Sequence, residues 1–212
     1  MAGIENYAAF ILAAIVFSMT PGIDTFFVLN RSVAQGRRTG VYSTLGISTG
    51  IVVHTIIAAA GLSALIAQSA AAFATVKYLG GAYLVCLGIM KLVRPGGGVP
   101  APSAPARTAP TSVWRDYVSG VLTNVLNPKV GLFFIAFFPQ FIRPAQLESI
   151  APFFILGLSY AAIGLVWLLI LTWLAGSVTT TLRGSPRVGR WLDRVSGAVF
   201  VLMGARVALE RA

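Results

Sequence analysis

Apolar residues occur along this chain in six long runs, separated by shorter stretches that carry most of the charges, glycines and prolines. A helix needs roughly 20 residues to cross the hydrocarbon core of a bilayer, at a rise of about 1.5 Å per residue. Each run is near that length, so the pattern predicts an all-α integral membrane protein with six transmembrane helices. The expected spans are residues 7–29, 41–66, 72–92, 114–139, 151–176 and 191–209.

Proline interrupts the first and the fourth of these runs. Pro21 is followed by Gly22, and Pro128 follows Asn127. Proline has no N–H and its ring clashes with the preceding helical turn, while glycine has little preference for staying helical. We therefore expect both helices to be broken at proline. The freed backbone groups should face protein or a wet cavity rather than lipid.

The two halves of the chain match one another in sequence. Aligning Pro21 with Pro128 superimposes two Phe-Phe pairs, and two more matches follow in the same order. Because three helices per half is an odd number, the second copy must enter the membrane from the opposite side. This predicts two inverted three-helix repeats, which are common in secondary transporters. The matched segments are residues 26–27 with 133–134, 45–48 with 156–159, and 81–88 with 197–204.

A stretch rich in glycine and proline separates the halves. Residues 94–113 cannot bury a core or hold one conformation, so they are expected to form a flexible linker. We expect a single membrane transport domain over residues 1–212, with repeat one at 1–93 and repeat two at 114–212.

The composition agrees with a membrane protein. Hydrophobic residues make up 57% of the 212 residues and charged residues 10%, whereas a soluble domain carries about 25% charged residues. The net charge of +10 does not indicate nucleic acid, because the bases are scattered through loops without the patch that such binding needs. No basic segment precedes the first run, so we expect it to stay in the membrane rather than be cleaved as a signal.

Lysine and arginine predict the orientation. They are concentrated in the first, third and fifth loops and sparse in the second and fourth. Cytoplasmic loops carry an excess of Lys and Arg. The odd loops should therefore be cytoplasmic and both termini should lie outside.

A carboxylate and an ammonium lie close to the two breaks. Asp24 follows Pro21 and Lys129 follows Pro128, each within about a turn. Because a charge at the centre of a membrane helix costs about 2.5–3.5 kcal/mol on insertion scales, both could face one cavity from opposite repeats. An amino acid carries the complementary charges: its ammonium could bind Asp24, and its carboxylate Lys129 or an open helix N-terminus. The alternative is a structural ion pair that holds the repeats in register.

Further polar residues could bind substrate or protons. Asp24 is the only carboxylate well inside a span, hence the best candidate for a proton carrier. His54 titrates in the range that suits a proton relay, and the alternative is a neutral imidazole bonded to a neighbouring helix. Thr25 could bond a substrate or its own backbone, and Asn127 a ligand or loose backbone. The candidate substrate- and proton-binding residues are Pro21, Gly22, Asp24, Thr25, His54, Asn124, Asn127, Pro128 and Lys129.

Other features indicate structure rather than chemistry. With one cysteine (Cys86), one histidine and most carboxylates near span ends, we expect no disulfide, no metal site and no cofactor. The four tryptophans, Trp167 included, are expected to anchor the helices at the membrane interfaces. The matched glycines should let helices pack closely.

Several short motifs point to one family. They are residues 20–25 (TPGIDT), 36–40 (GRRTG), 45–47 (LGI), 127–129 (NPK), 133–134 (FF) and 138–141 (FPQF). In these motifs and along its whole length the chain resembles the LysE/RhtB family of amino-acid exporters. One position departs from the family: Ile23 stands where a second proline is usual, which predicts a milder first break.

The resemblance implies export of an amino acid or a small derivative from the cytoplasm, driven by the proton gradient across a bacterial plasma (inner) membrane. It carries a core role over to six residues but not to His54. They are Pro21, Gly22, Asp24, Asn127, Pro128 and Lys129.

Two other functions stay open beside transport. A membrane-embedded enzyme would need a nucleophile–base pair or paired carboxylates, for which Asp24 with His54 is a thin basis. A channel would need rings of like polar groups around a pore, which one acid per chain supplies only in a homo-oligomer. We favour a secondary transporter, not an enzyme, that works by alternating access, with an amino acid, protons and the lipid bilayer as partners.

Overall fold

The structure is a computed structural model that describes residues 3–68, 70–93, 112–175 and 186–209. Over these ranges the chain is helical and contains no strand; Ile4 and Ile142 form an isolated antiparallel bridge. The linker predicted at 94–113 lies outside the described residues except for its last two. Of these, Ser112 accepts a hydrogen bond from the Arg115 N–H as the N-cap, and Val113 already belongs to the next helix.

The helices follow the order of the six apolar runs. The first run forms α1 (Tyr7–Met19) and α2 (Ile23–Gln35), the second α3 (Arg37–Gln68), and the third α4 (Ala70–Val93). The fourth forms α5 (Val113–Val125), α6 (Pro128–Phe137) and the 3-10 turn η1 (Phe138–Phe141), with η2 (Pro144–Gln146) after it. The fifth forms α7 (Ile150–Trp173) and the sixth α9 (Pro186–Leu209).

Four of these units are long and apolar enough to cross a membrane. They are α3 over Arg37–Gly61, α7, and the bent pairs α1–α2 and α5–α6, if each pair is counted as one span. Within α4 only the shorter stretch Tyr78–Val93 is apolar, and α9, with several charges in its first half, is not among the candidate spans of the described residues. Six crossings therefore stay a prediction for α4 and α9.

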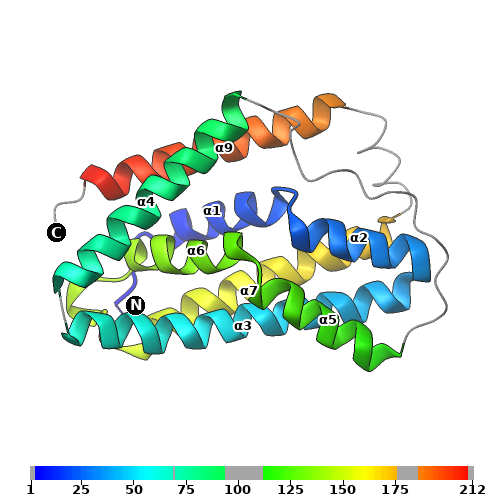
Figure 1. Ribbon diagram of the computed structural model, residues 1–212, viewed down its shortest axis with the longest axis horizontal. Coiled ribbons are helices and arrows are strands. Elements are labelled where there is room, and N and C mark those ends of the chain that lie inside the picture. The colour runs from blue at the N-terminus through cyan, green and yellow to red at the C-terminus, as the bar shows by residue number, and fades with distance from the viewer. Residues whose placement is uncertain (1–2, 69, 94–111, 176–185, 210–212) are drawn as a thin grey trace.

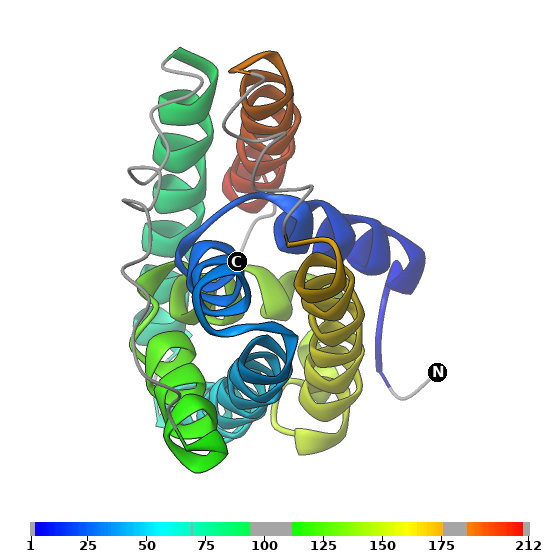
Figure 2. The same ribbon diagram turned by 90° about the vertical axis from the view of Figure 1, so that its right-hand side faces the viewer.

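Successive helices run in alternating directions along the long axis of the molecule (Figure 1). The pair α1–α2 and helix α7 run one way, and α3 and the pair α5–α6 run back. Helix α3 packs along α5 and α7, while α4 and α9 pack against each other on one side (Figures 1 and 2). Helix α6 thus lies between α3 and α4, and α1 contacts both α7 and α9, whereas α5 lies beside α3 on the side away from the α4–α9 pair.

Glycines let neighbouring helix backbones approach closely, as expected from their sequence spacing. A Cβ at Gly88 of α4 would lie 2.6 Å from the Gly197 carbonyl oxygen of α9, and a Cβ at Gly204 would similarly meet the carbonyl of Gly81. At the α3–α5 contact, a Cβ at Gly46 would overlap the backbone of the facing helix. Larger side chains at these positions would force the helices apart.

Six phenylalanines fill the end of the molecule where α1 begins and α6 ends. We call them the phenylalanine cluster; all are at most 2% exposed, and their rings stack or meet edge to face. The segment before α1 is tied to the same end, because the Glu5 N–H donates to the Phe141 carbonyl and the Arg143 N–H to the Gly3 carbonyl, each at 2.8 Å. The cluster comprises Phe10, Phe133, Phe134, Phe137, Phe138 and Phe141.

Candidate functional site

Both predicted breaks occur, and proline explains the backbone at each. A residue before proline is driven from the helical to the extended region; Thr20 has ψ 112° and Asn127 has ψ 106°. The helix axis bends by 50° between α1 and α2 and by 53° between α5 and α6. The two breaks are similarly sharp, so the milder first break expected from Ile23 is not observed.

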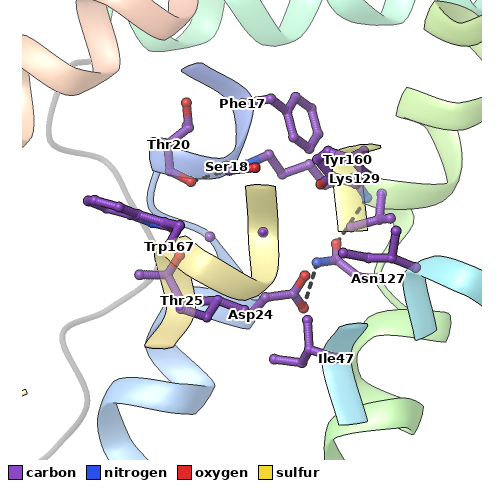
Figure 3. A pocket seen from close by; sticks show the side chains of 15 residues that line it. Phe17, Ser18, Thr20, Asp24, Thr25, Ile47, Asn127, Lys129, Tyr160 and Trp167 are labelled. Carbon is purple, nitrogen blue, oxygen red and sulfur yellow. Dashed lines mark hydrogen bonds between the residues drawn. The ribbon is translucent and has the colours of Figure 1, made fainter. Parts of the chain in front are cut away.

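The carboxylate of Asp24, in the first turn of α2, is held by two amides from the other break. Asn124 Nδ2 donates to Asp24 Oδ2 at 2.8 Å, and Asn127 Nδ2 donates to Oδ1 at 3.1 Å; Figure 3 shows the side chains of Asp24 and Asn127 pointing toward one another. Asn124 is fully buried. Gly50 of α3 leaves it room, because a Cβ there would lie 2.7 Å from the Asn124 side chain.

The ammonium of Lys129, in the first turn of α6, reaches back to the first break. Its Nζ donates to the Thr20 carbonyl at 3.2 Å and lies 4.3 Å from the centroid of the Phe17 ring. A cation over an aromatic face is attracted by the ring quadrupole. Among the described residues Lys129 forms no ion pair with Asp24. Each charged side chain therefore contacts the break in the opposite half of the chain rather than the other charge.

His54 of α3 bonds the Asn124 carbonyl at the second break, which also accepts a hydrogen bond from the Asn127 N–H at 2.9 Å. In an uninterrupted helix the N–H of residue 128 would bond the Asn124 carbonyl, but proline has no N–H. His54 Nε2 lies 3.1 Å from that oxygen and is the donor, because a carbonyl only accepts. The imidazole also stacks on Phe134. Both contacts are those expected of an imidazole that bonds a neighbouring helix for structural reasons. His54 is also not among the residues that line the cavity described next.

The two breaks enclose a small cavity. Gly22, Asp24, Thr25, Asn127 and Lys129 line it, and its volume is about 40 Å³. One water molecule occupies about 30 Å³ in the liquid, so the cavity is too small for an amino acid as it stands. Three of these residues, together with both prolines, also line a larger cavity of about 690 Å³ toward α4 and α9. The shared three are Gly22, Asn127 and Lys129.

The small cavity also contains polar residues that the sequence did not single out. Ser18 of α1 and Tyr160 and Trp167 of α7 line it (Figure 3). The Ser18 hydroxyl and the Trp167 indole N–H are buried and have no hydrogen-bond partner in the described ranges. The expected interfacial role is wrong for Trp167. The signal available in the sequence was its spacing from Tyr160 and Gly164, which puts these three residues on one face of a helix.

The arrangement of these residues suits the binding of a ligand more than the catalysis of a reaction. A carboxylate and an ammonium border one cavity, surrounded by amides, hydroxyls and an indole N–H. Within the described ranges, no three His, Cys, Asp or Glu residues are grouped so that they could hold a metal ion.

Several known proteins resemble this chain over almost its whole length. A protein of Vibrio cholerae described as an uncharacterized membrane protein is 32% identical and is covered over 99% of both chains. The homoserine/homoserine lactone efflux protein of Salmonella typhimurium is 31% identical over 98% of both chains. The leucine efflux protein of Klebsiella pneumoniae is 30% identical over 97% of this chain and 96% of its own.

No solved structure matches the chain. Residues 15–211, however, match the profile of a family described as LysE type translocator. On that match, which includes both breaks, the chain belongs to the LysE type translocator family.

Proposed function

We propose that this protein is a secondary transporter that exports an amino acid or a small amino-acid derivative from the cytoplasm. The proposal rests on its family and on relatives named for the efflux of homoserine, homoserine lactone and leucine. The same family and relatives favour transport over the other two functions considered from the sequence, a membrane-embedded enzyme and a channel. The coupling ion is the proton, and the mechanism is alternating access.

The observation that carries the proposal is the exchange of contacts between the two breaks. Asp24 of the first half binds Asn124 and Asn127 of the second, and Lys129 of the second half binds the Thr20 carbonyl of the first. Any movement of one half against the other must break these bonds. A substrate that competes for the same groups would therefore couple its own binding to that movement, at the depth where transporter sites lie.

Two inverted repeats within one domain follow from the same reasoning. The sequence match pairs Gly81 with Gly197 and Gly88 with Gly204. An internal two-fold axis would then convert the contact of Gly88 with Gly197 into a contact of Gly204 with Gly81, and both contacts are observed. We assign repeat one to residues 1–93 and repeat two to 114–212, with 94–113 as the linker.

The substrate would be recognised by its two opposite charges. An α-ammonium would replace the amide donors on Asp24, and an α-carboxylate would replace the Thr20 carbonyl at Lys129. Both exchanges put a full charge where a neutral partner now lies, and hydrogen bonds between charged groups are about twice as strong as neutral ones. The small cavity would have to widen toward the large one to admit the molecule.

Asp24 is the proposed proton carrier, and the predicted orientation fits export. The large cavity extends from the breaks to the C-terminal end of α4, from which the predicted cytoplasmic linker leaves. The opposite end is filled by the phenylalanine cluster. We therefore infer that this conformation offers the site to the cytoplasm of a bacterial cell, with both termini outside its inner membrane.

The test is proton-driven transport of L-homoserine and L-leucine in proteoliposomes. Asp24→Asn should abolish transport while leaving membrane insertion intact, because an amide cannot carry the proton. Glu148→Gln, which removes an exposed carboxylate from the turn before α7, is the matched control and should transport normally. Normal transport by Asp24→Asn would remove that residue from the mechanism, and no transport of any amino acid by the wild type would reject the function.

A further inference from the structure

The large cavity carries charge at the end away from the breaks. Lys91 of α4 and Asp193 of α9 line it and form an ion pair with each other. Their side chains are 17% and 11% exposed, so both are mostly buried but still reach solvent. Most of the remaining described lining is apolar, and Lys129 at the break is the third charged residue among the described residues that line it.

Packing does not account for this ion pair. Helices α4 and α9 already meet backbone to backbone at their glycines. Both side chains are mostly buried, and the cost of desolvating such a pair can exceed its Coulombic attraction, so the pair is weak evidence for a stabilising role. The ion pair lies on the wall of a cavity of about 690 Å³. Ligand pockets usually measure about 300–1,000 Å³, so this position suggests a role in binding.

We propose that Lys91 and Asp193 form an entry subsite for a zwitterionic amino acid on its way to the breaks. The substrate carboxylate binds Lys91 and its ammonium binds Asp193, so that one ion pair is replaced by two. Lys129 lines the same cavity as Lys91 and Asp193. The substrate carboxylate can therefore move from Lys91 to Lys129 and stay near a positive charge on the way.

This subsite rests on the proposed function and deepens it. The entry step governs how well substrate is collected, whereas Asp24 and Lys129 govern its translocation. Loss of the subsite should therefore raise the KM for substrate on the cytoplasmic side and leave the maximal rate nearly unchanged.

The experiment measures initial uptake of L-leucine and L-homoserine into inside-out membrane vesicles, whose cytoplasmic face is outward. Lys91→Gln, Asp193→Asn and the double variant should each raise the KM about fivefold, the factor that corresponds to about 1 kcal/mol. The thermal unfolding temperature of the double variant in detergent should stay at the wild-type value, because that variant leaves neither charge unpaired. Arg194→Gln, an exposed position next to Asp193 on α9, is the control and should leave both quantities unchanged.

A substrate without a carboxylate makes the test specific to Lys91. L-leucinamide keeps the ammonium but offers no anion, so Lys91→Gln should not change its KM, whereas Asp193→Asn should raise it. Unchanged KM values in all variants for leucine and homoserine would reject the subsite. A lower unfolding temperature of the double variant, together with a lower maximal rate, would show that the ion pair is structural and would also reject the subsite. A wild type that transports neither probe would instead remove the transport function on which the subsite rests.

Discussion

Side chains from the opposite half of the chain donate hydrogen bonds to a backbone carbonyl at each break. Lys129 binds the Thr20 carbonyl and His54 binds the Asn124 carbonyl, each from the other half of the chain. A typical hydrogen bond contributes about 0.5–1.5 kcal/mol to stability. These residues therefore stabilise the broken helices as well as bordering the candidate site, and variants at them must be judged on stability and transport separately.

His54→Gln tests whether the imidazole is a structural donor. Glutamine also carries an N–H donor, so we expect the variant to keep transport and its dependence on pH. His54→Leu removes one of the two donors to the Asn124 carbonyl, which keeps the Asn127 N–H, and should lower the free energy of unfolding by about 0.5–1.5 kcal/mol. Thermal unfolding in detergent and transport at several pH values provide both readouts. A stable His54→Gln protein whose transport fails and whose pH profile shifts would establish a proton relay instead.

Exchanging the charges of Asp24 and Lys129 should not restore function. The single variants Asp24→Lys and Lys129→Asp each put a charge against partners of the wrong kind. In the double variant an ammonium at position 24 would face the amide donors of Asn124 and Asn127, so we expect transport as low as in the single variants. Recovery in a proteoliposome assay would mean that the two charges pair directly at another stage of transport.

At the scale of helices, the packing depends on a few positions without side chains. Helices α3 and α5 meet at Gly46 and Gly120, where a Cβ on either would overlap the backbone of the other. The contact fixes the register between α3 of the first half and α5 of the second. It also sets where His54 and Asn124, which are further along the same two helices, meet.

Gly46→Ala should destabilise the protein although alanine favours helix. The new methyl group would overlap the Tyr117 carbonyl, and a buried overlap of this kind costs about 1–3 kcal/mol. Gly61→Ala on the same helix is the matched control, because nothing lies within 4 Å of a Cβ there. It should keep or raise the unfolding temperature, since alanine gains up to about 1 kcal/mol over glycine in a helix. Equal melting temperatures for the two variants would contradict the close approach of α3 and α5.

The sequence predicted the broken helices well and the walls of the cavity poorly, for a physical reason. Proline acts on its own turn, so Pro21 and Pro128 locate the breaks without knowledge of the fold. Which face of α7 turns inward is different, because that helix is apolar on all sides and hydropathy does not select a face. Trp167 was misplaced for this reason. Asn124 was a candidate site residue, but its hydrogen bond to Asp24 was not predicted, because a carboxylate within a membrane span suggests an opposite charge as its partner.

At the scale of the whole molecule, the two ends differ. One is packed with the phenylalanine cluster, and toward the other a large cavity extends along α4. The chain direction alternates along the long axis (Figure 1), so the arginine-rich start of α3 and the start of α5 lie at the end opposite the cluster. This difference between the ends is what a transporter open to one side requires.

Cysteine labelling tests the predicted orientation. In a Cys86→Ser background, Ala145→Cys lies exposed in the loop after α6 and Arg38→Cys lies exposed at the start of α3. On intact cells a membrane-impermeant maleimide should label position 145 and not position 38, because positive loops stay in the cytoplasm. After permeabilisation both should react, which controls for access. The reverse labelling pattern would invert the topology.

The phenylalanine cluster has a bioenergetic consequence. Protons cross a membrane protein most easily along a file of hydrogen-bonded waters, and six buried rings offer such waters no partner. In the proposed orientation, the phenylalanine cluster would separate the charged residues at the breaks from the outer side of the membrane and so would limit the leak of protons. A bacterium could therefore keep many copies of the protein idle without discharging its membrane.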